Sequence, residues 1–438
     1  MDSKIGRKAV LVYPRFHDDT FWSFKRSMKY VQPSRFGTPK ALMPPLGILG
    51  LGNHIRPFYD EILVVDRNVD PRPLEKLVKD ADHVYMGGMI AQERGFLEDA
   101  RIVKRAGKIL IAGGTIVDRD SRLMDIADHL VENEADIVIG DLLVGLRNGT
   151  AEKFYPGTAA IPERFFQPDF SLIDIRNYLN MALQITRGCP EDCEFCDITQ
   201  RFGKKPRITP WEYTETSLQQ LYNLGWRSKF FLVDDNFIGN PRWALDVLKN
   251  LYKIEERIGF HFPKYTELTM RLADESPLME ELREWFRKTK FISFFIGVET
   301  NNEDALRETR KFQNLRGDKS MKEKLEFISE ETGAGVMAGG IYGFDSDTPE
   351  SLVSQTRFFN STGIPEIMMG LLTALPSTKL WDRLKKEGRL KTRSSGNNSD
   401  GTMNFIPYNF SVREAEQAYV ELLDRIYNPD AFFKRVMR

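Results

Sequence analysis

Residues 187–197 read RGCPEDCEFCD, and this stretch decides the fold and chemistry that the sequence predicts. It contains Cys189, Cys193 and Cys196, which are all the cysteines of the chain, in a C-x3-C-x2-C arrangement. Iron–sulfur clusters are held by thiolates that one short loop brings together. Three thiolates can bind three irons of a cubane and leave the fourth open, as catalytic metal sites keep one position for a ligand. The stretch therefore predicts a [4Fe-4S] cluster bound by these three cysteines.

Three other interpretations of the cysteines compete with the cluster. A structural zinc site would normally have a fourth Cys or His at short spacing, and none lies nearby. Ordinary buried cysteines rarely gather three in eight residues at a strand end. A redox C-x2-C pair would leave Cys189 without a role. The cluster is the interpretation that agrees with both the spacing and the position in the chain.

Upstream of the cysteines, short apolar runs alternate with helical segments, as in a parallel sheet covered on both faces. The strands are expected at Lys8–Tyr13, Glu61–Asp66, His83–Gly87, Lys108–Ala112 and His129–Glu132. The glycine pairs Gly87-Gly88 and Gly113-Gly114 follow two of them. Either pair alone is explained by a tight turn, but open α/β sheets bind ligands at this edge. Together the pairs favour a cofactor-binding, Rossmann-like layer.

Around and beyond the cysteines a second alternating series follows. Its strands are expected at Met181–Thr186, Lys229–Val233, Tyr265–Met270, Phe291–Val298, Gly335–Tyr342 and Glu366–Thr373. The intervening and closing helices are expected at Trp211–Leu224, Pro241–Ile258, Pro277–Arg287, Met321–Thr332 and Val412–Tyr427. The series predicts a partial (β/α)6 TIM-like barrel with its chemistry at the carboxyl ends of the strands. The α/β chain is thus divided into residues 1–150 (Rossmann-like), 151–180 (a linker rich in Pro, Gly and Thr), 181–390 (barrel) and 391–438 (a small C-terminal helical extension).

Composition and charge narrow the class of protein. Lys plus Arg number 62 and Asp plus Glu 63, a balance that argues against a nucleic-acid or membrane-surface protein. Neither an export leader nor an apolar run of membrane-spanning length is recognisable, so a cytoplasmic location without a transmembrane segment is expected. The basic runs Lys311–Arg316 and Arg383–Lys391 are expected on solvated helix faces.

The sequence resembles the radical S-adenosylmethionine (SAM) superfamily, in the hopanoid-methylase-like subgroup with an N-terminal cobalamin-binding domain and a C-terminal extension. The resemblance covers nearly the whole chain. The stretches that carry it are Val12–Phe16, Phe21–Phe24, Pro44–Gly47, Arg187–Thr199, Val233–Gly239, Ile296–Thr300 and Gly343–Pro349.

The resemblance implies a set of SAM-binding residues at the strand ends. Asp234 and Asp235 would meet the methionine ammonium group, although a helix cap for the next turn explains them equally well. Glu299 and Thr300 would face the ribose hydroxyls or the amino acid, and Asp235 and Glu299 are the implied catalytic residues. The adenine-binding residues would be Gly339, Gly340, Gly343 and Leu375. Ser377 stands where the family usually has a glycine.

The resemblance also implies a cobalamin site. The histidine that ligates cobalt in Asp-x-His-x-x-Gly motifs is absent, because the segment reads Asp66-Arg-Asn-Val-Asp70. Arg67 or Asn68 would lie below the corrin, and residues further along would line its nucleotide tail. Those residues are Gly113, Gly114, Thr115 and Glu134.

The function that this implies is methylation of an unactivated carbon in a small-molecule, lipid or natural-product substrate. The cofactors would be the cluster, SAM and cobalamin, and the electron would come from a reducing partner such as flavodoxin or ferredoxin. A cobalamin-independent enzyme that transfers the 3-amino-3-carboxypropyl group of SAM to a small nucleophile is the alternative. A non-catalytic metal-binding interaction protein is the third possibility, which two cofactor-type modules disfavour.

Overall fold

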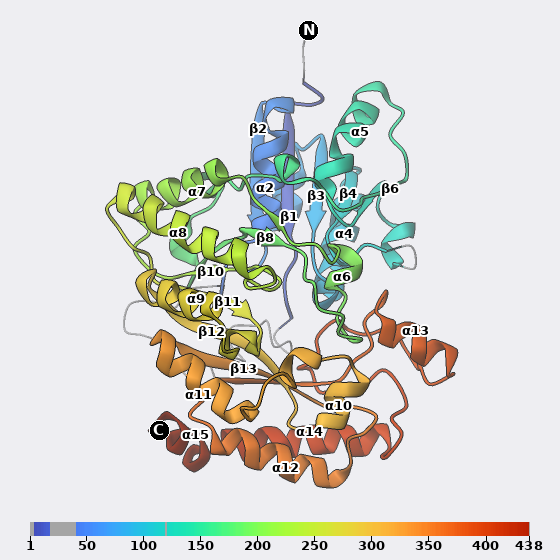
Figure 1. Cartoon of the computed structure of the whole chain (residues 1–438). Helices are drawn as coiled ribbons and strands as arrows, with labels where there is room; N and C mark the ends of the chain where they lie inside the picture. The colour runs from blue at the N-terminus through green and yellow to red at the C-terminus, as the bar shows by residue number, and fades with distance from the viewer. Residues whose placement is uncertain (1–3, 18–40, 119–120, 438) are drawn as a thin grey trace. The chain divides into compact units, whose positions relative to one another are not determined.

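The computed structural model describes residues 4–17, 41–118 and 121–437, and Figure 1 traces the chain. The chain forms two compact units. Unit 1 comprises Met1–Leu183 and Arg207–Arg227, and unit 2 comprises Gln184–Pro206 and Ser228–Arg438. The cysteine loop therefore belongs to unit 2. None of the helices among the described residues combines the length and the apolar character that a membrane span needs.

Unit 1 is built on a parallel sheet with the strand order β2-β1-β3-β4-β5-β6. The strands are β1 (Lys8–Tyr13), β2 (Glu61–Asp66), β3 (His83–Gly87), β4 (Ile109–Gly113), β5 (His129–Glu132) and β6 (Phe154–Pro156). The helices are α2 (Leu46–Ile55), α3 (Leu74–Val78), α4 (Glu93–Arg105), α5 (Ala135–Asn148) and α7 (Trp211–Asn223). The short strands β7 (Met181–Leu183) and β9 (Arg207–Ile208) also fall in this unit.

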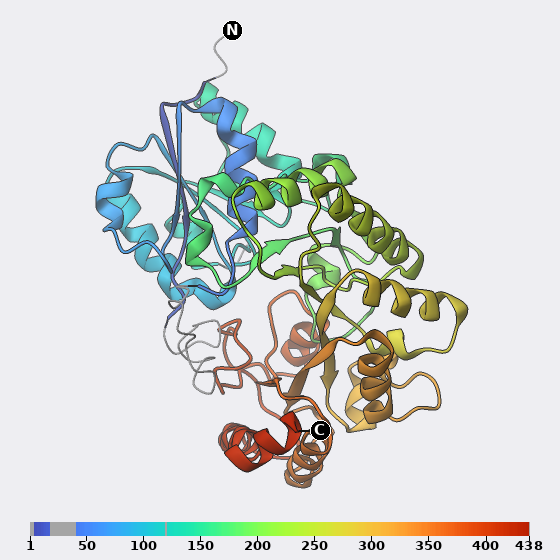
Figure 2. The ribbon, with the colours of Figure 1, turned by 90° about the vertical axis from the view of Figure 1, so that its left-hand side faces the viewer.

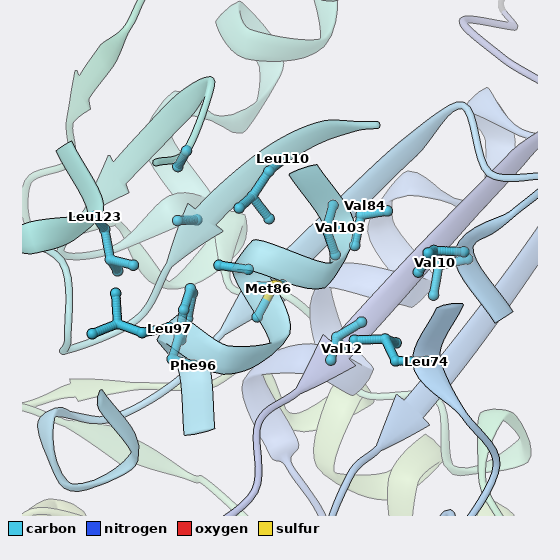
Figure 3. Close-up of a cluster of buried hydrophobic side chains, with 14 of the residues drawn as sticks. Val10, Val12, Leu74, Val84, Met86, Phe96, Leu97, Val103, Leu110 and Leu123 are labelled. Carbon is cyan, nitrogen blue, oxygen red and sulfur yellow. The ribbon is translucent and has the colours of Figure 1, made fainter. Parts of the chain in front are cut away.

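Alternate residues of the strands face two separate cores. Val10, Val12 and Met86 pack with α3 and α4 on one face of the sheet, and Figure 3 draws this cluster. Leu11 and Tyr85 pack with α2 and α5 on the other face. Figure 2 shows helices on both sides of this sheet. Continuous apolar strands such as KAVLVY are explained by this arrangement, because neither face of the sheet meets water.

Unit 2 carries a second parallel sheet, in which β10 to β14 follow the order β14-β13-β12-β11-β10. The strands of unit 2 are β8 (Thr186–Arg187), β10 (Phe230–Leu232), β11 (Lys264–Leu268), β12 (Phe291–Glu299), β13 (Gly335–Tyr342) and β14 (Ile367–Leu371). Its helices are α6 (Ile198–Arg201), α8 (Pro241–Ile258), α9 (Pro277–Lys288), α10 (Glu303–Glu308), α11 (Met321–Thr332), α12 (Pro349–Ser361), α13 (Lys379–Lys386), α14 (Val412–Tyr427) and α15 (Pro429–Val436). In Figure 1, α12, α14 and α15 lie side by side at the C-terminal end of this unit.

Local sequence signals set the ends of these helices. The Asn240 side chain accepts a hydrogen bond from the Trp243 N–H, Pro241 follows as the first helical residue, and α8 ends at Gly259 in the left-handed conformation. Ser320 and Glu323 form a capping box at the start of α11. Such signals explain why the predicted ranges of α8, α11 and α14 agree with the structure residue for residue.

Several predicted strands and helices are shifted at their ends by one or two residues, and two predicted segments differ in kind from the structure. The predicted linker contains β6, an edge strand of three residues that ends in Pro156. A strand this short that contains proline has no recognisable apolar pattern. The strand predicted at Met181–Thr186 is interrupted, because the backbone N–H groups of Ile185 and Thr186 donate to the carboxylate of Asp234. The predicted domain boundaries stay a prediction.

Candidate active site

The cysteine loop lies between β8 and α6, and its three cysteines are unpaired and partly buried. Two side-chain amides point their N–H groups at the sulfurs. Asn236 Nδ2 lies 3.8 Å from Cys189 Sγ, and Gln313 Nε2 lies 3.4 Å from Cys193 Sγ. Burial raises the pKa of Cys189 to about 11, so this thiol ionises readily only when a metal takes the place of its proton.

The spacing of the three sulfurs bears on which metal centre they could hold. Among the described residues, no group of three or more His, Cys, Asp or Glu side chains is gathered tightly enough to hold one metal ion. In a cubane each cysteine binds a different iron, so the three sulfurs do not have to converge on one ion. Amide donors to the sulfurs are also typical of iron–sulfur sites. The residues fit a [4Fe-4S] cluster.

Asp234 and Asp235, just after β10, tie this strand end to the segment that leads into the cysteine loop. The Oδ1 atom of Asp234 accepts the N–H of Ile185 at 2.8 Å and that of Thr186, and Oδ2 of Asp235 accepts the N–H of Gly188 at 2.6 Å. Burial raises the pKa of Asp234 to about 7. The two carboxylates therefore have structural partners, and their predicted contact with the methionine ammonium group stays a prediction.

Glu299, the last residue of β12, forms a buried ion pair with Lys311. Lys311 Nζ lies 2.6 Å from Glu299 Oε1, and both side chains are at most 10% exposed. Glu299 has φ +62°, a strained conformation for a residue other than glycine that often marks a functional site. A Cβ at Gly297 would overlap the Glu299 carboxylate and lie 2.8 Å from Lys311 Nζ, so this glycine makes room for the pair. Burial lowers the pKa of Lys311, but the attraction of Glu299 and of the Cys193 sulfur outweighs it and raises the pKa overall.

Packing explains part of the glycine pattern in β13. A Cβ at Gly340 would overlap Met369 and lie 2.9 Å from Phe359, and one at Gly339 would press against Phe295 at 3.1 Å. Gly343 has φ +104° and donates its N–H to Asp347 Oδ2.

Near β14, Ser377 has φ +68°, so it adopts the left-handed conformation that glycine takes freely. The carbonyl of Leu375 accepts a hydrogen bond from Thr378, and Thr300 is buried at the end of β12. The predicted adenine and ribose contacts of Gly339, Gly340, Gly343, Leu375 and Thr300 stay predictions.

Unit 2 also has buried polar atoms without a hydrogen-bond partner among the described residues. Four of these atoms are Oδ2 of Asp234, Oδ1 of Asn236, Oε1 of Gln313 and Oδ1 of Asn314. Asn236 and Gln313 are the residues whose amides point at the cysteine sulfurs. Because buried polar groups are normally satisfied, unpartnered atoms beside the cysteines fit a polar ligand such as SAM.

Sequence reasoning missed Glu267 in β11 and Lys311. Burial and the nearby Asp235 and Asp234 raise the pKa of Glu267 to about 7. Lys311 was predicted on a solvated helix face, and this prediction is wrong, because the residue is buried against Glu299. The prediction is equally wrong for Arg389, which is 8% exposed and paired with Asp345 and Glu387. The sequence did contain one signal for Lys311. Glu299 is an acid at the end of an apolar strand, and a buried acid needs a cation as partner.

In unit 1, the strand-end residues predicted below a corrin already have protein partners. Arg67 Nε lies 3.3 Å from Asp99 Oδ1, and its Nη1 donates to the carbonyl of Arg72. The Asn68 amide donates to Asp66 Oδ1 at 2.8 Å and to the Pro14 carbonyl at 3.2 Å. Neither side chain offers a nitrogen lone pair, since a guanidinium and an amide nitrogen are donors only. Neither Arg67 nor Asn68 could therefore ligate a cobalt ion through nitrogen, and their predicted place below a corrin stays a prediction.

The remaining residues predicted around the nucleotide tail lie after β4 and β5. Gly113 ends β4, and Gly114 (φ +91°) passes so close to the Gly88 backbone that a Cβ would overlap it. Thr115 follows and is half-buried. Glu134 is buried and holds Arg207 through both carboxylate oxygens, at 2.9 and 2.5 Å. Contacts of these four residues with cobalamin stay predictions.

Comparison with known proteins decides the family. The model of the radical SAM superfamily matches residues 183–359, and that of a domain of unknown function, DUF4070, matches residues 378–438. An uncharacterized methyltransferase of Synechocystis sp. is 35% identical over 443 residues, covering 98% of this chain and 78% of the relative. The chain belongs to the radical SAM superfamily. Within it, this radical SAM enzyme falls among the methyltransferases.

Further relatives of the radical SAM protein agree with this. The hopanoid C-2 methylase of Rhodopseudomonas palustris is 29% identical over 436 residues, covering 98% of this chain and 79% of the relative. Two solved structures share the fold. TsrM from Kitasatospora setae, a methyltransferase with cobalamin and a [4Fe-4S] cluster bound, has a TM-score of 0.64 at 12% identity and covers 87% of this chain and 75% of its own. OxsB, with aqua-cobalamin and SAM bound, has a TM-score of 0.67 at 13% identity, and the match covers 98% of this chain and 70% of OxsB.

These findings confirm the predicted family, fold class and enzyme class. The Rossmann-like layer and TIM-like barrel expected from the strand pattern are the fold of TsrM and OxsB. Both were solved with cobalamin, which is among the cofactors predicted for this chain. The resemblance stretch Phe21–Phe24 lies outside the described residues.

Proposed function

We propose that the protein is a cobalamin-dependent radical SAM methyltransferase that methylates an unactivated carbon of a small-molecule, lipid or natural-product substrate. The observation that carries the proposal is the cysteine loop with amide donors at two of its sulfurs, beside buried polar atoms that lack partners. The similarity to a hopanoid methylase over 98% of the chain supports the reaction class.

When bound, the cluster supplies an electron, SAM supplies both the methyl group and a radical, and cobalamin carries the methyl group. Cys189, Cys193 and Cys196 would hold the cluster. Asn236 and Gln313 lower the negative charge on two sulfurs by donating N–H groups to them. Lys311 adds a buried positive charge near Cys193 and is itself held by Glu299.

The lower face of the corrin is the part of the proposal that the sequence makes unusual. Arg67 and Asn68 would lie below the corrin and would offer it no nitrogen ligand, since a guanidinium and an amide nitrogen are donors only. The electron is proposed to come from flavodoxin or ferredoxin.

The test uses the whole protein, reconstituted anaerobically with iron and sulfide, incubated with hydroxocobalamin and freed of excess. We expect stoichiometric cobalamin with a base-off absorption spectrum. With methyl-labelled SAM and a reductant, we expect 5'-deoxyadenosine. The matched control is Cys193→Ala, which leaves unit 1 unchanged and should retain cobalamin but not cleave SAM.

Two results would contradict the proposal. If the protein cleaves SAM but retains no cobalamin, methyl transfer through cobalamin is wrong. If methylthioadenosine replaces 5'-deoxyadenosine, the protein transfers the 3-amino-3-carboxypropyl group, the alternative that the methyltransferase relatives do not favour.

A further inference from the structure

The cysteine loop carries acids between its cysteines. Glu191, Asp192 and Glu194 lie within the same eight residues as the three thiols. Like charges this close repel one another, and the repulsion grows as water is excluded. A loop of this composition therefore needs cations from other parts of the fold to keep it closed.

Glu194, between Cys193 and Cys196, has the best-defined partner. Its side chain is 10% exposed and binds Arg383 in a two-pronged pair, with Nε at 2.7 Å from Oε1 and Nη2 at 3.1 Å from Oε2. The backbone is held as well. The N–H of Leu380 donates to the Glu194 carbonyl at 3.0 Å, and the N–H of Glu194 donates to the Thr309 carbonyl at 2.9 Å.

Asp192, the residue before Cys193, is held by Lys379. Lys379 Nζ lies 2.5 Å from Asp192 Oδ2. Arg310 and Lys204 contact the same carboxylate at 2.9 and 2.6 Å. Two acids that flank one cysteine thus have partners on the same helix, α13.

Arg383 also reaches a second loop. Its Nη1 lies 2.8 Å from Oδ2 of Asp345, in the loop that follows β13. Arg389 pairs with the other oxygen of Asp345. One guanidinium therefore connects the cysteine loop with the loop after the fifth barrel strand.

The helix that supplies these cations is itself firmly placed. Thr378, which is fully buried, caps α13 by accepting the N–H of Trp381 at 3.1 Å. Leu380 and Leu384 are 1% and 0% exposed, so they fix an adjacent face of the helix in the core. α13 is the first helix of the matched domain of unknown function, residues 378–438.

We propose that α13 positions the cysteine loop for cluster binding, with Arg383 as its central positioning residue. This assigns a role to the start of the matched domain of unknown function, and it rests on the proposed function because the loop must hold the cluster. Outer groups that orient metal ligands commonly change affinity for the metal centre by about 10- to 100-fold. Arg383 acts through Glu194 and touches neither cofactor nor substrate.

The experiment compares wild-type protein with Arg383→Gln, Arg383→Lys and Glu194→Gln. Lys385→Gln is the matched control, because it removes a positive charge from an exposed position of the same helix. The first readout is amide hydrogen exchange of residues 189–196 in the metal-free protein, with the thermal unfolding midpoint measured alongside. The second is iron and sulfide content after reconstitution, and the rate at which air destroys the cluster.

We expect Arg383→Gln and Glu194→Gln to exchange the Glu194 and Cys196 amides about tenfold faster and to lose cluster about tenfold faster, with Lys385→Gln unchanged. Arg383→Lys keeps the charge but not the two-pronged geometry, so it should restore part of the protection. Combining Arg383→Gln with Glu194→Gln should add little to either variant alone.

Normal exchange and normal cluster lifetime in a folded Arg383→Gln protein would overturn the proposal. If that variant fails to fold, the same normal result in Arg383→Lys and Glu194→Gln would overturn it. Failure of the proposed function is a different result. Wild-type protein that binds cluster but no cobalamin would refute the proposed function and leave both readouts of α13 unchanged. Wild-type protein that binds no cluster would also refute it, while the exchange of the metal-free loop would still report the action of α13.

Discussion

Replacing Asp234 with asparagine should remove a large pH dependence from the stability of the metal-free protein. The carboxylate is fully buried after β10, with Oδ1 accepting two backbone N–H groups and Oδ2 lacking a partner among the described residues. Asparagine keeps the accepting oxygen and cannot ionise. It therefore changes the charge of this site and leaves its shape.

The direction in which stability changes with pH follows from the pKa of Asp234. Burial raises the pKa of Asp234 from the ordinary 3.8 to about 7, so the folded protein binds the proton more tightly than the unfolded chain. The contribution of Asp234 to stability is complete below pH 3.8 and is lost as the pH rises through about 7. At about 1.4 kcal/mol per pH unit, the interval of roughly 3 units corresponds to about 4 kcal/mol.

The assay is equilibrium urea unfolding of metal-free protein at several values between about pH 4 and pH 8. The free energy of unfolding of wild type minus that of Asp234→Asn should fall by about 4 kcal/mol across this range. Asp246→Asn, at an exposed position of α8, is the matched control and should show no such trend. A difference between wild type and Asp234→Asn that does not change with pH would refute the reasoning.

Two further predictions concern the cluster and the Glu299–Lys311 pair. Cys196→Ala should lose most of the about four irons that the reconstituted wild type carries, measured as iron and sulfide per protein, and full retention would contradict the assignment of the ligands. Gly297→Ala should lower the free energy of unfolding by about 1–3 kcal/mol in urea titrations, because its methyl group overlaps Glu299 and crowds Lys311. Gly335→Ala, whose nearest contact would be an ordinary 3.6 Å to the Ile292 carbonyl, is the control, and equal losses in both variants would contradict the packing argument.

Much of the fold could be predicted because its signals are local. Apolar runs such as Lys8–Tyr13 and His83–Gly87 need only their own residues to be recognised as buried strands, and their ranges agree with the structure. The helix α8 was bounded by Asn240 and Gly259 in the same way. β6 was missed because a three-residue edge strand ending in proline has no pattern of its own.

The site was predictable only where its residues are close in sequence. Three cysteines within eight residues can be recognised from the sequence alone. The partners of Glu194 and Asp192 in α13 lie almost two hundred residues away, and their sequence resembles that of any charged helix face. The prediction for Lys311 was wrong for a related reason. The acid that Lys311 neutralises, Glu299, belongs to a different element. Packing distances, rather than residue types, separate a buried ion pair from a solvated one.

The position of α13 also bears on how such proteins can diverge. The two family matches, residues 183–359 and 378–438, divide the ion pairs between them, with Asp192, Glu194 and Asp345 in the first and Lys379 and Arg383 in the second. A hybrid that joins residues 183–359 of this chain to a C-terminal domain without these cations would leave the acids unpaired. We therefore expect residues 183–359 and 378–438 to be inherited together. A substitution of an acid in the first segment should be accompanied by a substitution of its cation in the second.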